Sequence, residues 1–262
     1  MTITVGPLET VLRAARDRGR RLLVPYVTGG LAPDWTQTVA AMAAAGADAI
    51  EIGIPFSDPA MDGPVIQEAS TRALARGTTP AGVVAELAGL DVGVPLIAMT
   101  YYNLVFRAGH RRFAEMLRRG GMTAAIVPDL PLEESGPWEG DAAEAGIETV
   151  LLAAPVTPDE RLVRLVEHSH GFVYCVGVMG VTGERTTLSD TASVLARRLK
   201  QVTDKPVLIG FGISTPDQAR QACETADGVI VASTLMRRYL DGESPEAIGA
   251  RVAELRAALD AG

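Results

Sequence analysis

One segment of the sequence places acidic residues within and after a predicted strand. It reads Glu51-Ile52-Gly53-Ile54-Pro55-Phe56-Ser57-Asp58-Pro59-Ala60-Met61-Asp62-Gly63-Pro64. Glu51 stands inside an apolar stretch, whereas Asp58 and Asp62 lie in a loop that is stiffened by proline. Burying a charged group costs several kcal/mol of hydration, so a carboxylate in an apolar strand usually has a partner or a chemical task. The segment is therefore a candidate acid/base site.

The elements that must position these acids alternate along the whole chain. Short apolar runs, typical of parallel strands buried on both faces, are separated by helical stretches. Eight runs are expected strands: Leu22–Thr28, Ala47–Gly53, Pro95–Thr100, Thr123–Val127, Glu148–Ala153, Phe172–Val176, Pro206–Gly210 and Gly228–Val231. No linker or low-complexity segment divides the 262 residues. This pattern predicts an α/β fold, a (β/α)8 TIM barrel forming a single domain over residues 1–262.

A doubly wound open sheet is the alternative fold. Its nucleotide-binding version is disfavoured because no GxGxxG pattern follows the first strand. Two helix starts share a further pattern, Thr157-Pro158-Asp159-Glu160 and Thr215-Pro216-Asp217-Gln218. Each predicts a threonine N-cap, a proline at the first helical position and a capping-box partner.

A barrel would direct Glu51 toward an active site, because barrel active sites lie at the C-terminal ends of the strands. Side chains alternate along a strand, so the isoleucines flanking Glu51 should face helices and Glu51 the interior, near the upper rim. The alternative is a structural ion pair, but the other predicted strands contain no basic residue apart from Arg21 just before the first. Asp58 and Asp62 each precede a turn-forming residue, yet either could complete an acid/base pair with Glu51.

The loops after the last strands have the composition of an anion site. Gly210-Phe211-Gly212-Ile213-Ser214 follows the seventh strand, and Ala232-Ser233-Thr234 follows the eighth. Barrels often bind phosphate here through backbone N–H groups and a helix N-terminus, and glycine lets the backbone approach the anion. After the sixth strand, Gly180-Val181-Thr182-Gly183-Glu184-Arg185 suits either a mobile lid or an ordinary surface loop.

Composition narrows the classes of function. The net charge of −8, with 47% hydrophobic and 21% charged residues, is typical of a soluble globular protein and gives no nucleic-acid footprint. Cys175 and Cys223 lack metal-ligand spacing, and the three histidines form no zinc pattern. No apolar run is long enough for a bilayer, and arginines interrupt any signal-peptide core at the N-terminus. These features predict a reduced, cytoplasmic chain with no metal and no membrane or nucleic-acid partner.

Taken together, the motifs resemble those of the tryptophan synthase α subunit family over nearly the whole chain. The segments that carry the resemblance are Val24–Thr28, Gly46–Asp48, Glu51–Pro64 with Gln67, Tyr101–Asn103, Pro128–Pro131, Gly180–Gly183 and Gly210–Ser214. Members of this family are TIM barrels that cleave indole-3-glycerol phosphate to indole and glyceraldehyde 3-phosphate. The resemblance implies no cofactor in this chain. It also implies a β-subunit partner that contains pyridoxal phosphate, in an α2β2 complex that channels indole and supports tryptophan biosynthesis.

The resemblance also implies a role for individual residues. Glu51 and Asp62 would be the catalytic pair: a Glu51 with a raised pKa would move protons, and an ionised Asp62 would accept the indole N–H. The other implied roles are substrate binding for Tyr26, Tyr101, Tyr174 and Thr182, phosphate binding for Gly183, Gly212, Ala232 and Ser233, and partner contact for Asp58. Thr182 would hold Asp62 when the lid closes.

Three segments depart from the family pattern, and several functions remain open. The departures are Thr28–Asp34 after the first strand, Gly177-Val178-Met179 before the lid, and Ala232-Ser233 where Gly-Ser is common. They imply altered loop geometry, altered lid docking and a phosphate held less closely. The rival functions are a self-sufficient indole-3-glycerol phosphate lyase, a non-catalytic barrel that activates a partner, and a phosphosugar isomerase.

Overall fold

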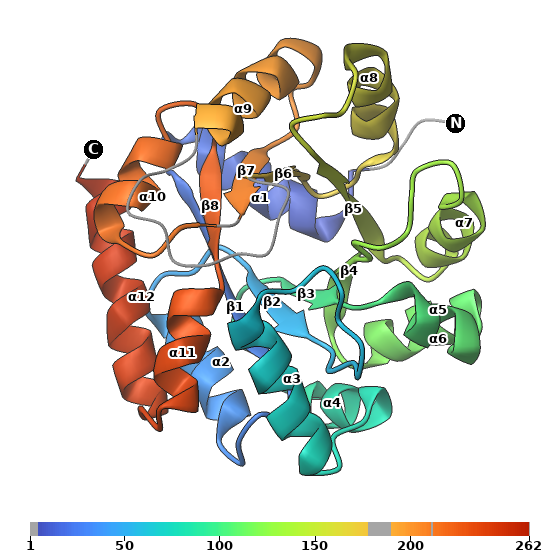
Figure 1. Cartoon of the computed structure of the whole chain (residues 1–262), viewed down its shortest axis with the longest axis vertical. Helices are drawn as coiled ribbons and strands as arrows, with labels where there is room; N and C mark the ends of the chain where they lie inside the picture. Colours follow the sequence, from blue (N-terminus) through green and yellow to red (C-terminus); the bar gives the residue numbers. More distant parts are fainter. Residues whose placement is uncertain (1–4, 178–189, 211, 262) are drawn as a thin grey trace.

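The chain folds into a closed barrel of eight parallel strands, in a computed structural model that describes residues 5–177, 190–210 and 212–261. The strands pair in sequence order from β1 to β8, and β8 pairs with β1 (Figure 1). They are β1 Leu22–Thr28, β2 Ile50–Gly53, β3 Leu96–Met99, β4 Met122–Ile126, β5 Glu148–Ala153, β6 Val173–Val176, β7 Val207–Gly210 and β8 Gly228–Val231. The predicted barrel is confirmed, and the open sheet is excluded.

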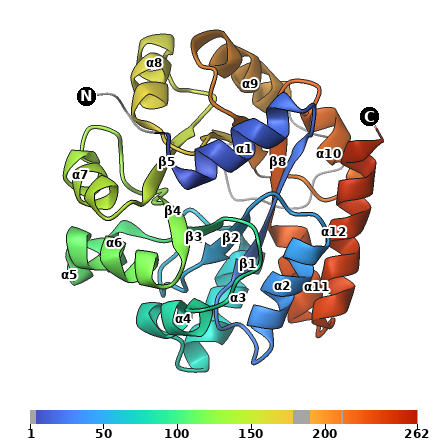
Figure 2. The ribbon, with the colours of Figure 1, turned by 180° about the vertical axis from the view of Figure 1, so that it is seen from behind.

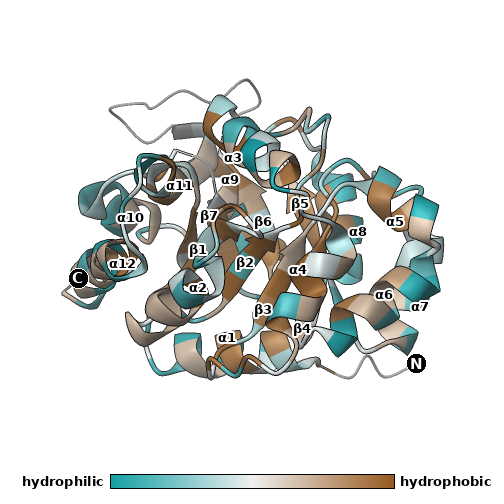
Figure 3. Ribbon diagram, turned by 90° about the horizontal axis from the view of Figure 1, so that it is seen from below, coloured by the Kyte–Doolittle hydropathy of each residue, from teal (hydrophilic) through white to brown (hydrophobic). Residues whose placement is uncertain are grey.

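Helix α1, Pro7–Asp17, covers one end of the barrel, and the other helices surround it on its outer side. The outer helices are α2 Trp35–Ala44, α3 Pro64–Ala75, α4 Pro80–Leu87, α5 Tyr102–Ala108, α6 His110–Arg119, α7 Gly136–Glu144, α8 Asp159–His168, α9 Asp190–Val202, α10 Pro216–Ala222, α11 Ser233–Leu240 and α12 Pro245–Asp260. Figure 3 shows apolar strands at the centre and polar surface on the outer helices. Within the described ranges, no helix is long and apolar enough to cross a membrane.

The strand predictions agree closely with the structure, with one informative exception. Three strands match residue for residue, and four others differ by one residue at one or both ends. The second strand begins at Ile50 rather than Ala47. The Asp48 carboxylate accepts the N–H of Leu23 at 2.9 Å and pairs with Arg20 at 2.6 Å. The backbone N–H of Asp48 also donates to the Leu23 carbonyl at 2.9 Å, so side-chain and backbone contacts both join Asp48 to β1 just before β2 begins.

The core has two parts, which explains why so many strand residues are apolar. Alternate residues such as Leu22, Val24 and Ile97 fill the barrel interior, while their neighbours pack against the helices. At one end of the barrel, α1 inserts the fully buried Leu8 and Leu12 into the interior cluster. Figure 2 shows α1 lying across this end. The opposite end of the barrel, at the C-terminal ends of the strands, is where an active site is expected.

The two threonine–proline helix starts behave differently. At Thr215, the hydroxyl accepts the N–H of Gln218 and the full capping box forms, as predicted. At Thr157, the prediction of an N-cap is wrong, because the cap position falls on Pro158. The Thr157 hydroxyl instead accepts the N–H of Ala154 at 3.1 Å, inside the preceding turn. The Thr157 hydroxyl thus serves a hydrogen bond within the turn and does not cap the helix.

Candidate active site

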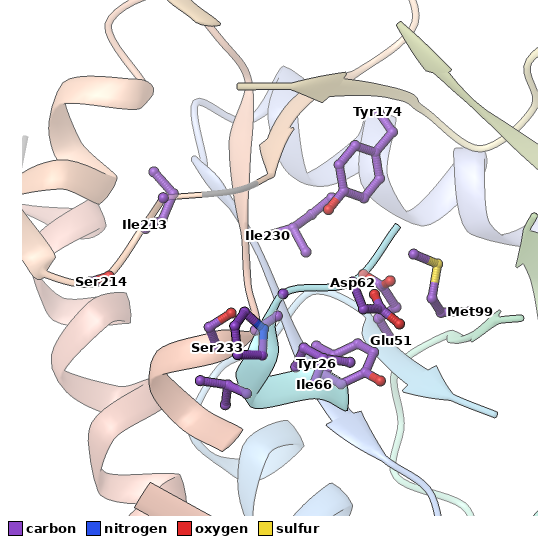
Figure 4. A pocket seen from close by; sticks show the side chains of 15 residues that line it. Tyr26, Glu51, Asp62, Ile66, Met99, Tyr174, Ile213, Ser214, Ile230 and Ser233 are labelled. Atoms are coloured by element: carbon purple, nitrogen blue, oxygen red, sulfur yellow. The ribbon is translucent and has the colours of Figure 1, made fainter. Parts of the chain in front are cut away.

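A cavity of about 220 Å³ opens at the C-terminal end of the barrel strands. Its walls come from strand ends and from the first residues of two helices, α3 and α11 (Figure 4). The lining residues are Tyr26, Glu51, Asp62, Gly63, Pro64, Val65, Ile66, Met99, Tyr174, Gly212, Ile213, Ser214, Ile230, Ala232 and Ser233. In Figure 4 the two acids lie together at one side, and Ile213 and Ser214 lie at the other.

Glu51 faces the interior of the barrel, as the strand alternation predicted. Its side chain lines the cavity and is only 2% exposed, while Ile50 and Ile52 pack outward with the helices. No hydrogen-bond partner for its Oε2 atom exists among the described residues, and no ion pair with a basic residue forms there. Burial raises the pKa of Glu51 to about 8, and the nearby Asp62 carboxylate raises it further in the same direction. Near pH 7 this carboxyl group is therefore mostly protonated.

Asp62 shares the cavity with Glu51 but has a different environment. It lies in the loop before α3, where its N–H donates to the Pro59 carbonyl and its carbonyl accepts from the Gln67 amide. Burial raises the pKa of Asp62 to about 6, and a hydrogen bond from Tyr101 opposes that rise. The two neighbouring acids thus differ in pKa, so one can hold a proton while the other is ionised.

Two tyrosines form part of the cavity wall, and each lies over a strand-end glycine of the next strand. Tyr26 of β1 lies over Gly53 of β2, and Tyr174 of β6 lies over Gly210 of β7. A Cβ at Gly53 would come within 1.8 Å of the Tyr26 hydroxyl oxygen, and one at Gly210 within 2.1 Å of that of Tyr174. The Tyr26 hydroxyl also lies 3.2 Å from Oγ1 of Thr28. Because Gly53 and Gly210 have no side chain, they leave room for the Tyr26 and Tyr174 rings in the cavity wall.

We expect Gly53→Ala to destabilise the protein, because the added methyl group overlaps the Tyr26 ring. Overpacking of this kind lowers the free energy of unfolding by about 1–3 kcal/mol. Gly140→Ala, on α7, is the matched control because its Cβ would meet nothing within 4 Å. Urea denaturation of both variants measures the effect. Equal stability of the two variants would contradict this reading of the wall.

The opposite side of the cavity is built from small residues and a helix start. Gly212 has a φ of +83°, a backbone conformation that favours glycine, and lines the cavity with Ser214. Helix α11 begins at Ser233 with Ala232 as its N-cap, and both residues line the cavity. The first N–H groups of a helix have no intrahelical partner, so this end of α11 can receive an anion.

The structure brings most of the predicted site residues into this cavity. Glu51, Asp62, Tyr26, Tyr174, Gly212, Ala232 and Ser233 all line it. Tyr101 lies beside Asp62 but is not among the lining residues, and Asp58 is exposed on the loop surface. Thr182, Gly183 and the rest of the predicted lid lie outside the described residues.

Sequence reasoning missed several apolar lining residues. Met99, Ile230 and Ile66 line the cavity beside the acids and tyrosines. Met99 and Ile230 share the interior face of their strands, so strand alternation could have identified both. Ile66 sits in the first turn of α3, and no sequence pattern pointed to it. In the described part of the chain, no group of His, Cys, Asp and Glu could hold a metal ion.

The barrel has a buried and a half-buried acid at one side of its cavity and an anion-receptive helix end at the other, and these features define a class of barrel enzymes with acid/base sites. The chain belongs to the tryptophan synthase alpha chain family, whose model matches residues 12–260. The tryptophan synthase alpha chain of Synechocystis is 44% identical over 252 residues, covering 94% of this chain and 95% of its own length. That of Arabidopsis thaliana is 40% identical over 249 residues, covering 93% and 90%.

Solved structures agree with this family assignment. A structure of Mycobacterium tuberculosis tryptophan synthase superimposes with a TM-score of 0.91 at 36% identity, covering 99% of this chain and 100% of that one. The tryptophan synthase alpha chain of Legionella pneumophila superimposes with a TM-score of 0.86 at 30% identity, covering 98% of each chain.

Proposed function

We propose that this chain is the α subunit of a tryptophan synthase and cleaves indole-3-glycerol phosphate to indole and glyceraldehyde 3-phosphate. This lyase reaction is a step in L-tryptophan biosynthesis. The observation that supports it best is the buried Glu51 carboxyl group, which faces the cavity beside Asp62 with one oxygen unpaired by any described residue. A structural role would have given that oxygen a partner.

Glu51 moves the protons of this retro-aldol cleavage. Its carboxylic acid first protonates C3 of the indole ring, which gives an indolenine cation. The carboxylate so formed then takes the proton of the adjacent side-chain hydroxyl as the carbon–carbon bond breaks. The electrons of that bond return to the ring, the alcohol carbon becomes the aldehyde, and Glu51 regains its proton. A pKa of about 8 suits both steps near neutral pH.

Asp62 stabilises the charge that develops on the ring. Its pKa of about 6 leaves it mostly ionised near pH 7, so it can accept the indole N–H and oppose the positive charge of the cation. Tyr26 and Tyr174 contribute aromatic walls for the ring, and Met99 and Ile230 add apolar surface. These contacts favour an indole over a simple sugar phosphate, which disfavours the isomerase alternative.

The phosphate of the substrate lies at the other side of the cavity. Gly212 and the N-terminus of α11, at Ala232 and Ser233, provide backbone N–H groups for it. By the family resemblance, Gly183 also binds the phosphate and Thr182 holds Asp62, and both residues lie outside the described ranges. Ala232 carries a methyl group where the family often has glycine, so the anion sits slightly farther from this backbone.

The working protein is an α2β2 complex with a tryptophan synthase β subunit, located in the cytoplasm. The β partner carries pyridoxal phosphate, and this chain needs no cofactor of its own. Asp58 is exposed on the loop that leads to Asp62, and Ser57 donates to its carboxylate at 2.5 Å. A partner that contacts Asp58 would therefore touch the segment that carries a catalytic residue.

One experiment tests the function and its rivals together: indole release from indole-3-glycerol phosphate, measured with and without a tryptophan synthase β subunit. We expect slow release by the chain alone and a large stimulation by β. Fast release that β does not stimulate would favour the self-sufficient lyase. No release under either condition would favour the non-catalytic barrel.

A further inference from the structure

Tyr101 lies behind Asp62 rather than in the wall of the cavity. Its ring is 5% exposed and stacks on Phe56, with ring centroids 5.2 Å apart. Its hydroxyl oxygen accepts the backbone N–H of Met61 at 3.1 Å, and its O–H group acts on the neighbouring Asp62 carboxylate as a hydrogen-bond donor that lowers the pKa of that group. One phenol thus contacts two successive residues of the acid-bearing loop.

The backbone at Tyr101 is itself held in place. Tyr101 is the N-cap residue of α5, and the N–H of the following Tyr102 donates to the Asp129 carboxylate at 2.9 Å. The Tyr102 hydroxyl points elsewhere and pairs with Nε2 of His110 at 3.1 Å. The two adjacent tyrosines therefore have separate tasks, and only Tyr101 reaches the cavity acids.

From these contacts we propose that Tyr101 is a positioning residue, which orients the Asp62 carboxylate and keeps it ionised for its part in the cleavage. This inference rests on the proposed function. It differs from the substrate-binding role that the family resemblance implied, because Tyr101 is not among the lining residues and its hydroxyl is engaged by the loop that carries Asp62. A hydrogen bond donated to a carboxylate favours its ionised form.

Other titratable groups around Asp62 do not duplicate this effect. Glu51 on β2, Tyr26 on β1 and Tyr174 on β6 also interact with it, while Asp129 interacts with Tyr101. Glu51 is mostly neutral near pH 7 because its pKa is about 8. Tyr101 is the group whose hydrogen bond lowers the pKa of Asp62.

Tyr101→Phe tests the proposal, since it removes the hydroxyl and keeps the ring that stacks on Phe56. We expect kcat for indole-3-glycerol phosphate cleavage to fall about tenfold at pH 6 and less at pH 8, with KM changed by less than about threefold. The acid limb of the pH profile should move to higher pH. Tyr102→Phe is the matched control and should leave both kcat and the profile unchanged.

A second pair of variants separates positioning from substrate contact. In an Asp62→Asn background, Tyr101→Phe should cause no further loss, because its effect acts through Asp62. An additional tenfold loss there would overturn the proposal. So would a Tyr101→Phe profile that falls equally at every pH with a raised KM, which is the behaviour of a wall residue.

A substrate-free measurement keeps the proposal testable even if the proposed reaction is wrong. Carbon-13 NMR of labelled aspartate carboxyls gives the titration midpoint of Asp62, assigned as the resonance that Asp62→Asn removes. We expect that midpoint to rise in Tyr101→Phe and to stay unchanged in Tyr102→Phe. An unshifted midpoint in Tyr101→Phe would overturn the proposal, whereas failure of the proposed function alone would appear as loss of wild-type cleavage with this shift intact.

Discussion

Glu51→Gln should lower kcat for indole-3-glycerol phosphate cleavage by about a thousandfold to ten-thousandfold. The amide has nearly the same shape but can neither give a proton to C3 nor take one from the hydroxyl, so both proton transfers lose their carrier. Because the geometry of the cavity is kept, KM should change little. Single-turnover and steady-state assays of indole formation, with the β subunit present, measure the loss.

Two further variants frame this result. Asp62→Asn should cost about a hundredfold to a thousandfold, because an electrostatic contact is removed while the proton carrier stays. Glu160→Gln, an exposed carboxyl in the first turn of α8, should have no effect. If Glu51→Gln retained near-normal turnover, Glu51 would have no part in the reaction and the proposed mechanism would fail.

The strands and their closed order were predictable from the sequence. Each strand is buried on both faces and is therefore a short apolar run, and eight such runs separated by helices indicate a closed barrel. Glu51 could be located for the same reason: its neighbours Ile50 and Ile52 face the helices, which turns it inward. The start of β2 was predicted three residues early, at Ala47 rather than Ile50, because Asp48 is held to β1 partly through its side chain and no sequence period encodes such a contact.

The features that were not predictable depend on contacts between distant segments. Tyr101 and Asp62 are separated by 39 positions in the sequence. Only the folded structure shows that the Tyr101 phenol lies beside the loop that carries Asp62. The tyrosine–glycine pairs require the register of adjacent strands, which places Tyr26 beside Glu51 and hence its hydroxyl over Gly53. Thr157 and Thr215 carry the same local pattern, yet the fold caps a helix with only one of them.

Glu51 and Asp62 have different surroundings, which favour different protonation states. Glu51 sits on a strand among apolar side chains with one oxygen unpaired by any described residue, which favours its neutral form. Asp62 sits on a loop and receives a hydrogen bond from Tyr101, which favours its ionised form. The burial of Glu51 should also lower the free energy of unfolding wherever its carboxyl group must ionise, because a buried carboxylate opposes folding.

That cost should be measurable as a dependence of stability on pH. Unfolded, Glu51 titrates near 4.5, and folded, its pKa is about 8. Between these values the folded state binds more protons than the unfolded state, so the free energy of unfolding falls as pH rises from about 4.5 to about 8. Below 4.5 both states are protonated, and above 8 both are ionised, so the Glu51 contribution is constant outside this window.

Glu51→Gln removes the group responsible and should therefore be more stable than the parent protein at pH 9, by about 3–5 kcal/mol. At pH 4.5 the two proteins should differ by less than about 1 kcal/mol, because the parent then also carries a neutral side chain at this position. Urea denaturation at both pH values gives the difference, and Glu160→Gln serves as the control that should show none. Asp62 titrates in both proteins, and its repulsion of the Glu51 carboxylate is part of the difference expected at pH 9. A stability difference that stays the same at the two pH values would mean that Glu51 ionises as easily in the folded chain as in the unfolded one, and the carboxyl group would then lack the raised pKa on which its role as an acid depends.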